Sequence, residues 1–428
     1  MIRKIQLLFV LLLGSFAFAQ NSTASPYSLG ALGDVTFRGN AINRIMGGMD
    51  AYADSIHANI NNPASLGELK LTTFSVGVNY RTTSLSTDIG KENVSSGAID
   101  YLAVSIPTKH FAFSFGVLPY SSVGYLLQSV GTTADDLTTL SRYEGSGGVN
   151  KTFLTAGFRP FKFLNVGASV QYNFGTINTQ SSYEEEGIDF GTFLRNSSSL
   201  SGLNIQLSAH YKYQLSEDKR INLFTTFNPK HNLRSKNLQT FFTQTVGTRT
   251  PGDFQEIDLA ARGLDELDLT LGSRIDIGLS VEHDKKWLVG IQYTASNSGN
   301  YQNDFIKLNN VSYENGSRLS IGGMYIPSYS SFTTYWKRMV FRAGFRHETS
   351  GILINNTSLK ETGISFGVGL PIGGYYSGNN VAGFSNINIG LEVGKRGTTT
   401  AGLVRENFVA LRVGMSLNDL WFIKRVYN

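Results

Sequence analysis

The chain has 428 residues, no cysteine, 37 Lys and Arg against 32 Asp and Glu, and a formal net charge of +5. The absence of cysteine excludes a disulfide framework, thiolate metal sites and a lipid-anchored cysteine. The basic residues are scattered instead of clustered, which gives no support to nucleic-acid binding. Aromatic residues make up 12% of the chain, beside 46 Gly and only 9 Pro, and this balance favours a β-rich fold.

Residues 1–19 have the pattern of a secretory signal peptide. Arg3 and Lys4 precede an apolar stretch that ends in the small-x-small cleavage pattern Ala17-Phe18-Ala19. An apolar run of about 14 residues is too short to span a bilayer as a helix, which needs ~20. We expect an exported protein whose mature chain starts at Gln20.

Apolar and polar residues alternate with a period of two through most of the remaining chain. Leu203, Ile205 and Leu207, for example, are separated by Asn204 and Gln206. Strands of about 10 residues with this pattern are typical of membrane β-barrels, whose apolar side chains face lipid and whose polar side chains face the lumen. The sequence therefore predicts an all-β fold, a transmembrane antiparallel β-barrel of about fourteen strands. The predicted strands are 70–80, 97–106, 110–119, 148–158, 162–175, 199–214, 219–228, 269–283, 286–295, 316–327, 338–347, 360–371, 384–395 and 406–418.

The connections between these strands predict the orientation of the barrel. Outer-membrane barrels alternate short periplasmic turns with long extracellular loops. The predicted turns are short after the second, fourth, sixth and eighth strands, whereas 81–96, 120–147, 176–198, 229–268 and 296–315 read as long loops; two later turns, 328–337 and 372–383, are longer than the rule expects. An even strand count returns the chain to its starting side. We expect a barrel at 67–418, a periplasmic tail at 419–428 and both termini in the periplasm of a Gram-negative outer membrane.

Residues 20–66 do not alternate, and they are rich in glycine. Gly47-Gly48 and Asn62-Pro63-Ala64 are signals for tight turns. This predicts a compact plug inside the lumen. The alternative interpretation is a disordered leader.

Short motifs in this region resemble the hatch of the FadL-type transporters of hydrophobic compounds. They are Gly39-Asn40-Ala41, Arg44 to Gly48, Ala53-Asp54, Asn62-Pro63-Ala64 and the following strand Thr72 to Gly77. The resemblance implies a fourteen-stranded barrel with an N-terminal hatch and a sideways exit for the ligand through the wall. It also implies that Asn62, Pro63 and Ala64 help to hold the hatch, whose motif residues further include Asp54 and the turn Gly47-Gly48.

The third predicted strand is the candidate for that lateral opening, near Gly116 to Pro119. Proline cannot donate to a strand ladder, so a local break at Pro119 is physically reasonable. The alternative is that Pro119 simply ends the strand at its loop.

The Ser-Pro-Tyr-Ser start and the tail Leu420 to Arg425 resemble FadL-like barrels of Bacteroidetes, whose relatives include shuttle proteins of the type IX secretion system. Two functions therefore stay open. The first is passive uptake of a small hydrophobic molecule, fatty-acid-like or aromatic. The second is a non-transporting barrel that acts as a structural partner or shuttle in protein secretion or surface assembly. Outer-membrane lipid and lipopolysaccharide are the expected surroundings in both cases.

Four charged residues fall on the lumen-facing register of late strands: Arg342, Arg346, Glu392 and Arg412. Because isolated buried charges cost several kcal/mol, they need partners. We expect a lumen charge cluster in which the arginines clamp the hatch through Asp50 and Asp54. Solvation by lumen water is the alternative.

No catalytic or metal-binding pattern stands out. The six His residues are far apart, and no zincin motif is present. His210 lies on a lumen register, where it could belong to a hydrolase triad, but the sequence locates no partners for it. The acidic stretches Glu184 to Glu186 and Asp253 to Asp258 lie in predicted loops, where solvation or bridging cations explain them. We expect neither an enzyme nor a bound cofactor or metal.

Overall fold

A computed structural model of the chain describes residues 23–30, 32–35, 39–331, 333–373, 375–377, 380–382 and 384–419. The expected signal peptide at 1–19 lies outside these residues, and so does the expected tail apart from Asp419. Among the helices that are described, none is both long and apolar enough to cross a bilayer.

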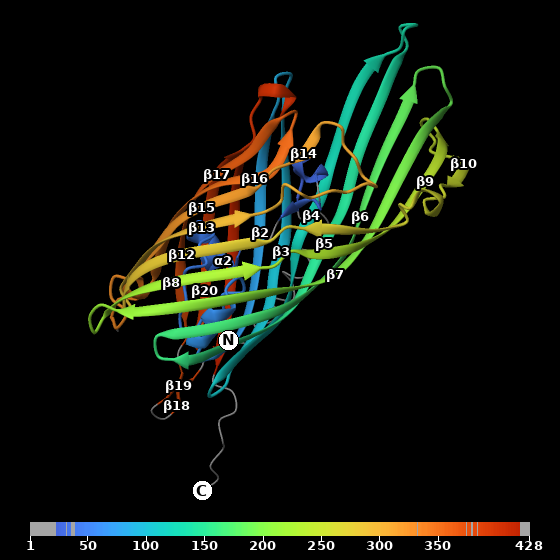
Figure 1. Cartoon of the computed structure of the whole chain (residues 1–428). Helices are drawn as coiled ribbons and strands as arrows, with labels where there is room; N and C mark the ends of the chain where they lie inside the picture. Colours follow the sequence, from blue (N-terminus) through green and yellow to red (C-terminus); the bar gives the residue numbers. More distant parts are fainter. Residues whose placement is uncertain are drawn as a thin grey trace.

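Fourteen antiparallel strands close into a barrel (Figure 1), which confirms the predicted fold class. The closure pairs the first wall strand with the last, from Thr72↔Asp419 to Ser86↔Arg405. The wall strands are β2 (Thr72–Ser86), β3 (Lys91–Pro107), β4 (Phe111–Thr132), β5 (Thr138–Phe161), β6 (Leu164–Glu185), β7 (Phe190–Gln214), β8 (Lys219–Asn228), β12 (Arg274–His283), β13 (Trp287–Ser296), β15 (Gly316–Tyr325), β16 (Val340–Ile354), β17 (Thr357–Ile372), β20 (Phe384–Arg396) and β21 (Arg405–Asp419).

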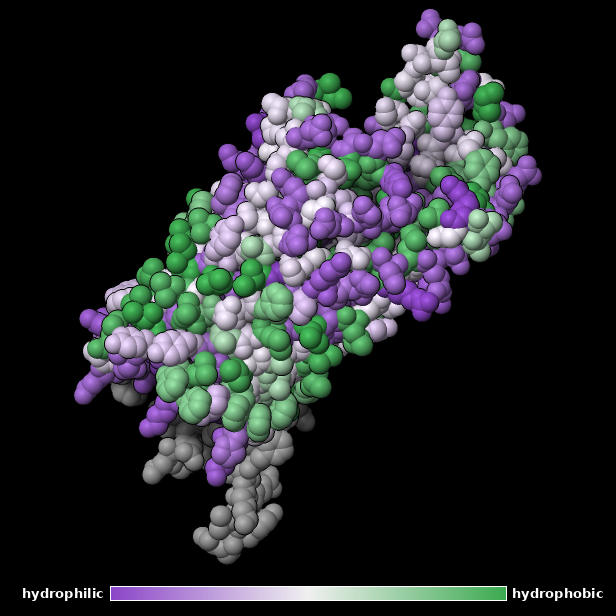
Figure 2. All heavy atoms as spheres, viewed as in Figure 1, coloured by the Kyte–Doolittle hydropathy of each residue, from purple (hydrophilic) through white to green (hydrophobic). Residues whose placement is uncertain are grey.

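The alternation in sequence becomes an inside and an outside in the wall. Ile277 and Leu279 of β12 are 49% and 44% exposed, whereas Asp276 and Ser280, which flank them in the sequence, are buried. Figure 2 shows hydrophobic side chains gathered mainly over the lower part of the molecule, below the polar lobes. An apolar outer surface with a polar interior is the arrangement that a lipid environment stabilises.

The six strands β2 to β7 are longer than predicted, and this corrects three loops. Residues 81–96 continue the β2–β3 hairpin, which pairs as far as Ser86↔Lys91. Residues 120–147 and 176–198 continue the β4–β5 and β6–β7 hairpins, which pair as far as Thr132↔Thr138 and Tyr183↔Thr192. Apolar residues occur on both faces of these extensions, with Val123 and Ile177 buried and Leu126 and Val130 exposed, so they lack the regular alternation by which the membrane-length part was recognised. The two ends of the barrel therefore differ, and we name them the short-turn end and the long-hairpin end.

The predicted loop at 229–268 and the predicted strand at 269–283 are also corrected. They contain an added sheet, β9 (His231–Thr245), β10 (Pro251–Glu256) and β11 (Glu266–Leu271), with the short helix η4 (Ala260–Arg262). The membrane strand itself, β12, starts only at Arg274. Other short elements are β14 (Val311–Tyr313), β18 (Tyr375–Ser377), β19 (Asn380–Ala382), η5 (Tyr335–Arg338) and η6 (Thr400–Gly402).

Residues 23–69, which we name the N-terminal segment, fold into η2 (Pro26–Leu29), β1 (Asp34–Val35), α2 (Ala41–Ile45) and η3 (Pro63–Glu68). Asn40 caps α2 by accepting a hydrogen bond from the Asn43 N–H at 3.0 Å. The segment contacts β5, β6 and β7 through η3, and β16, β17, β20 and β21 through α2. Because these strands lie on opposite sides of the barrel, the segment lies between them.

Candidate functional site: the filled lumen and the β3–β4 seam

The wall carries glycines where the N-terminal segment touches it. A Cβ atom built on Gly344 would lie 2.0 Å from the Gly47 nitrogen, and one on Gly167 would lie 2.4 Å from the Pro63 carbonyl carbon. Gly157, Gly322, Gly390 and Gly414 face the segment at similar separations of 2.3 to 2.7 Å. Segment backbone and wall are thus in direct van der Waals contact, with no space for a ligand at these points.

The expected hatch residues occupy two sides of this interface. Gly47 and Gly48 follow α2 with φ of +70° and +76°, left-handed values that favour glycine, and Gly47 lies against β16. On the other side, Asn62 and Pro63 start η3, and the Ala64 N–H donates to the Ser208 hydroxyl of β7 at 2.6 Å.

Asp54 shapes a turn within the segment. Its carboxylate accepts from the backbone N–H groups of Ile56 and His57 at 2.9 and 2.7 Å, and it pairs with the His57 ring at 2.6 Å. Burial raises the pKa of Asp54, but His57 and these hydrogen bonds outweigh it and hold the pKa at about 2. Asp54 is therefore ionised in the folded protein and fixes the local backbone.

Three of the four expected cluster residues meet at one carboxylate. Glu392 pairs with Arg346 at 2.5 Å and with Arg412 at 3.3 Å, and Arg346 also reaches Glu361 at 2.6 Å. All four are buried. The partner from the N-terminal segment is Arg44, which donates to Glu392 at 2.9 Å. The sequence places Arg44 in a hatch motif but does not predict its pairing with Glu392, because the alternation identifies only wall positions.

Arg346 does not pair with Asp50 or Asp54, the partners that the sequence predicted for it; it pairs with glutamates of the wall. Asp50 lies 3.9 Å from Arg318 of β15 and accepts from the Gln292 amide at 3.2 Å. Burial raises the pKa of Asp50 to about 6, although Arg318 opposes the change. Arg342 donates to Asn388 at 2.8 Å and lies near Tyr52 and Asp54. A further ion pair joins Asp34 of the N-terminal segment to Arg396 of β20 at 3.1 Å.

A cavity of about 280 Å³ remains between the segment and the wall. Its apolar lining includes Leu32, Ile60 and Phe153, and its polar lining includes Gln171, Asn204 and Arg318. Lys151 lines it too, with its ammonium 4.3 Å from the centre of the Tyr120 ring. The buried oxygens of Gln171 and Asn204 have no hydrogen-bond partner within the described part of the chain. The cavity is therefore amphipathic, with spare capacity for hydrogen bonds.

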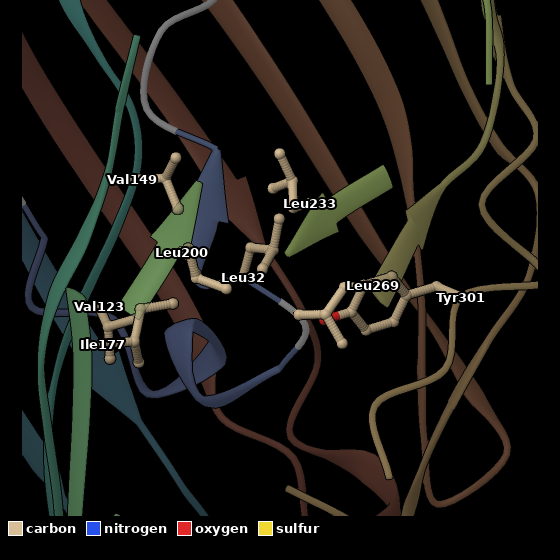
Figure 3. Packing of buried hydrophobic residues seen from close by; sticks show 8 residues of the cluster. All are labelled: Leu32, Val123, Val149, Ile177, Leu200, Leu233, Leu269 and Tyr301. Atoms are coloured by element: carbon tan, nitrogen blue, oxygen red, sulfur yellow. The ribbon is translucent and has the colours of Figure 1, made fainter. Parts of the chain in front are cut away.

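An apolar cluster surrounds Leu32 of the N-terminal segment. Figure 3 shows Leu32 among inward side chains of the surrounding strands, with Leu269 beside Tyr301. The cluster consists of Leu32, Val123, Val149, Ile177, Leu200, Leu233, Leu269 and Tyr301. Leu32 thus packs against apolar side chains of the wall strands, of β9 and β11, and of Tyr301.

The wall is only partly paired between β3 and β4, where all residues are described. Their ladder runs from Pro107↔Ala112 to Leu102↔Val117 and ends there, although β3 continues back to Lys91 and β4 on to Thr132. We name the stretch beyond the end of this ladder the β3–β4 seam. Gly116 lies in the last part of the ladder, and the β4–β5 register shifts between Pro119 and Ser121.

A pocket of about 1220 Å³ lies at this seam. Its walls come from both strands and from the start of the N-terminal segment: Ala24, Pro26, Val94, Leu126 and Leu127 are among them. Next to it, β1 pairs with β4 through Asp34↔Ser122 and Val35↔Ser121. The segment therefore borders the seam without closing it as a full strand would.

His210 does not form a triad. Its ring nitrogens face Asn165 at 3.2 Å and Asn222 at 3.1 Å, and the ring stacks on Phe224 at 3.9 Å. Neither amide can act as the nucleophile or the orienting carboxylate that a hydrolase needs. Among the described residues, no group of His, Asp and Glu has the arrangement of a metal site.

The family model for BamG matches residues 1–428. No curated protein matches the chain. Solved structures with a similar fold include the Pseudomonas putida toluene transporter TodX, at 15% identity and TM-score 0.56, with 89% of this chain and 97% of that chain covered. A Pseudomonas aeruginosa FadL homologue matches at 10% identity and TM-score 0.57, covering 89% and 98%. The Ralstonia pickettii toluene transporter TbuX matches at 16% identity and TM-score 0.53, covering 89% and 98%. The chain therefore belongs to the BamG family, and its fold is the FadL-type barrel.

Proposed function

We propose that this barrel passes a small hydrophobic molecule from the long-hairpin end to the membrane through the β3–β4 seam. The observation that carries the proposal is the end of the β3–β4 ladder at Leu102↔Val117 beside a pocket of about 1220 Å³. A gap in a barrel wall exposes unpaired backbone groups, and these are tolerated only where a cavity or protein borders them.

In this proposal the N-terminal segment does not move during transport. It forms the hatch, a domain that spans residues 20–66. The direct contacts at Gly344 and Gly167 and the buried Arg44–Glu392 pair hold it in place. A molecule that enters the lumen then leaves sideways, because the path past the floor is filled.

The ligand that fits is small, apolar or aromatic, with room for one polar group. TodX and TbuX are toluene transporters, which supports an aromatic ligand, and the cavity adds Lys151 above the Tyr120 ring as a place for a negative or polar end. No covalent chemistry is required.

The outer membrane of a Gram-negative bacterium, of the Bacteroidetes branch, is the proposed location. The apolar outer face and the FadL-type fold support it. The long-hairpin end faces outward beside lipopolysaccharide, and both termini are periplasmic.

The test uses N-phenyl-1-naphthylamine, an apolar dye that fluoresces once it reaches the outer membrane. Whole cells that express the protein should take up the dye several-fold faster than cells that do not. Val94→Trp with Leu127→Trp fills the seam pocket and should return the rate to the background. Val130→Trp is the matched control, because Val130 lies on β4, is 71% exposed and does not line the pocket. An uptake rate equal to the background for the wild type contradicts transport.

The second candidate function is that of a non-transporting partner in protein secretion or surface assembly. The close packing of the N-terminal segment against the wall favours it. The same assay separates the two, since a sealed barrel leaves dye uptake at the background level with every variant.

A further inference from the structure

The added sheet at 229–273 ends in an open strand edge. Along β7, Phe190–Ser201 pair with β9, whereas Leu207–Gln214 pair with β8, so β9 replaces β8 as the partner of β7 and starts the added sheet. On the other side of β9 lie β10, which Figure 1 labels beside it, and β11. Among the described residues β10 pairs with β9 alone, and its outer edge faces no strand.

This edge carries some of the features that usually protect one, namely Pro251, a bulge and the acidic residues Asp253 and Glu256. All six residues of β10 are exposed, and Phe254 is 71% exposed. Edge strands are commonly blocked by lysine, proline or inward charges. Here Pro251 and a bulge protect only the start, and the ladder to β9 continues through Phe254, Gln255 and Glu256. These residues offer backbone groups to a further strand.

An aromatic row runs across the same part of the sheet. Phe254 lies opposite Phe242 of β9, which stacks on Phe193 of β7 at 5.1 Å. Paired residues share one face of a sheet, so Phe254 extends this row to the open edge. A strand added there would find an apolar surface for one of its side chains.

The acidic residues near β10 favour a partner strand with basic side chains. Backbone hydrogen bonds join three hairpin tips: the Glu186 N–H donates to Thr138 at 2.9 Å, and the Val246 N–H donates to Asp189 at 2.8 Å. These tips, at 133–137, 184–189 and 246–256, carry one basic residue, Arg249, and eight acidic residues: Asp135, Asp136, Glu184, Glu185, Glu186, Asp189, Asp253 and Glu256. None of the eight takes part in an ion pair with another described residue. We name these eight residues the acidic rim.

We propose that the outer edge of β10 is a docking site for an extended, basic segment of a protein partner, which adds to the sheet as a strand. Its backbone pairs with Phe254 to Glu256, an apolar side chain contacts Phe254, and its Lys or Arg side chains face the acidic rim. This docking is separate from transport, because β10 does not line the seam pocket.

The experiment uses the full chain in lipid nanodiscs and a fluorescent heptapeptide that alternates Lys and Val. Binding, followed by anisotropy, should be saturable and should weaken at least five-fold with Phe254→Ala and with Glu256→Pro, which removes an N–H that faces the open edge. Asp253→Lys with Glu256→Lys should abolish it. Asp88→Lys is the control, because Asp88 is an exposed acid in the β2–β3 turn outside the rim.

Two further peptides keep the proposal falsifiable. A peptide with proline at its centre keeps the charge but cannot pair as a strand, and a Glu-Val peptide reverses the charge; neither should bind. Equal binding of the proline peptide means that charge alone attracts the probe, and this overturns the proposal. Binding that needs added calcium overturns it too, because the rim then acts as a cation site. Unchanged heat-modifiable migration in gels verifies that each variant is folded.

Discussion

Arg44 of the N-terminal segment donates to Glu392 of β20 at 2.9 Å, and both side chains are buried. This one carboxylate also receives Arg346 and Arg412 of the wall. The contact joins the segment to the barrel at a point where neither side has water to replace a lost partner. Its removal is the most direct test of how firmly the segment is held.

Glu392→Ala should loosen the N-terminal segment and destabilise the barrel. Removing one partner of a buried ion pair costs about 3–5 kcal/mol, because the other charges stay buried without compensation. We expect trypsin to cut at Arg44 in the variant and not in the wild type, and a lower temperature for the loss of the folded band in gels. Glu266→Ala should change neither property, since Glu266 forms an exposed pair with Arg234. Resistance of the Glu392 variant to trypsin would mean that the glycine contacts alone hold the segment.

Gly344→Ala tests those contacts. The new Cβ would lie 2.0 Å from the Gly47 nitrogen, so either the wall or the segment must shift. Overpacking of this kind costs about 1–3 kcal/mol. We expect a folded barrel with lower unfolding temperature and faster proteolysis of the segment. Gly97→Ala is the control, because its nearest neighbours are 3.4 Å away. Equal proteolysis of the two variants would show that the N-terminal segment is not tightly packed against the wall at Gly344.

The wall could be predicted because its signal is local. In each membrane-length strand, lipid selects apolar residues on one face, so alternation marks the strand wherever it occurs. The extensions of β4 to β7 escaped prediction because their apolar residues do not alternate regularly with polar ones. For the same reason the open edge of β10 was read as part of a loop.

The candidate site could be predicted only in part, because it is formed by contacts between residues far apart in the sequence. Arg346, Glu392 and Arg412 were grouped from their shared lumen register, and they do meet. Arg44 and Arg318, the residues that join cluster and segment, lie far away along the chain from their partners. The β3–β4 seam is equally non-local: Pro119 suggested a break in one strand, but where the ladder ends is fixed by how two strands separate.

Glu68 should make the protein less stable in acid. At the end of η3, its carboxylate binds Lys212 and Arg159 of the wall. Burial raises its pKa, but these partners and Asn165 outweigh it and hold the pKa at about 2. Since this value lies below that of the unfolded chain, the stabilisation is present above pH 4.5 and is lost as the pH falls towards 2. Between pH 6 and pH 3 the wild type should lose about 2 kcal/mol relative to Glu68→Gln, measured by urea unfolding in bicelles. Parallel pH profiles for the two proteins would contradict this.

Asp50 should have the opposite effect, since its pKa of about 6 lies above the ordinary value of 3.8. Burial is the main cause, and Arg318 at 3.9 Å is too far away to offset it. A raised pKa means that the stabilisation is complete below pH 3.8 and is lost as the pH rises through 6. Asp50→Asn keeps the shape and removes the titration. Between pH 4 and pH 7 the wild type should therefore lose about 2 kcal/mol relative to this variant in the same urea assay. Asp253→Asn is the control, because Asp253 lies exposed on β10 and its variant should follow the wild-type profile. A difference between wild type and Asp50→Asn that stays constant over this range would mean that Asp50 is ionised throughout, and hence that the N-terminal segment admits water at this point.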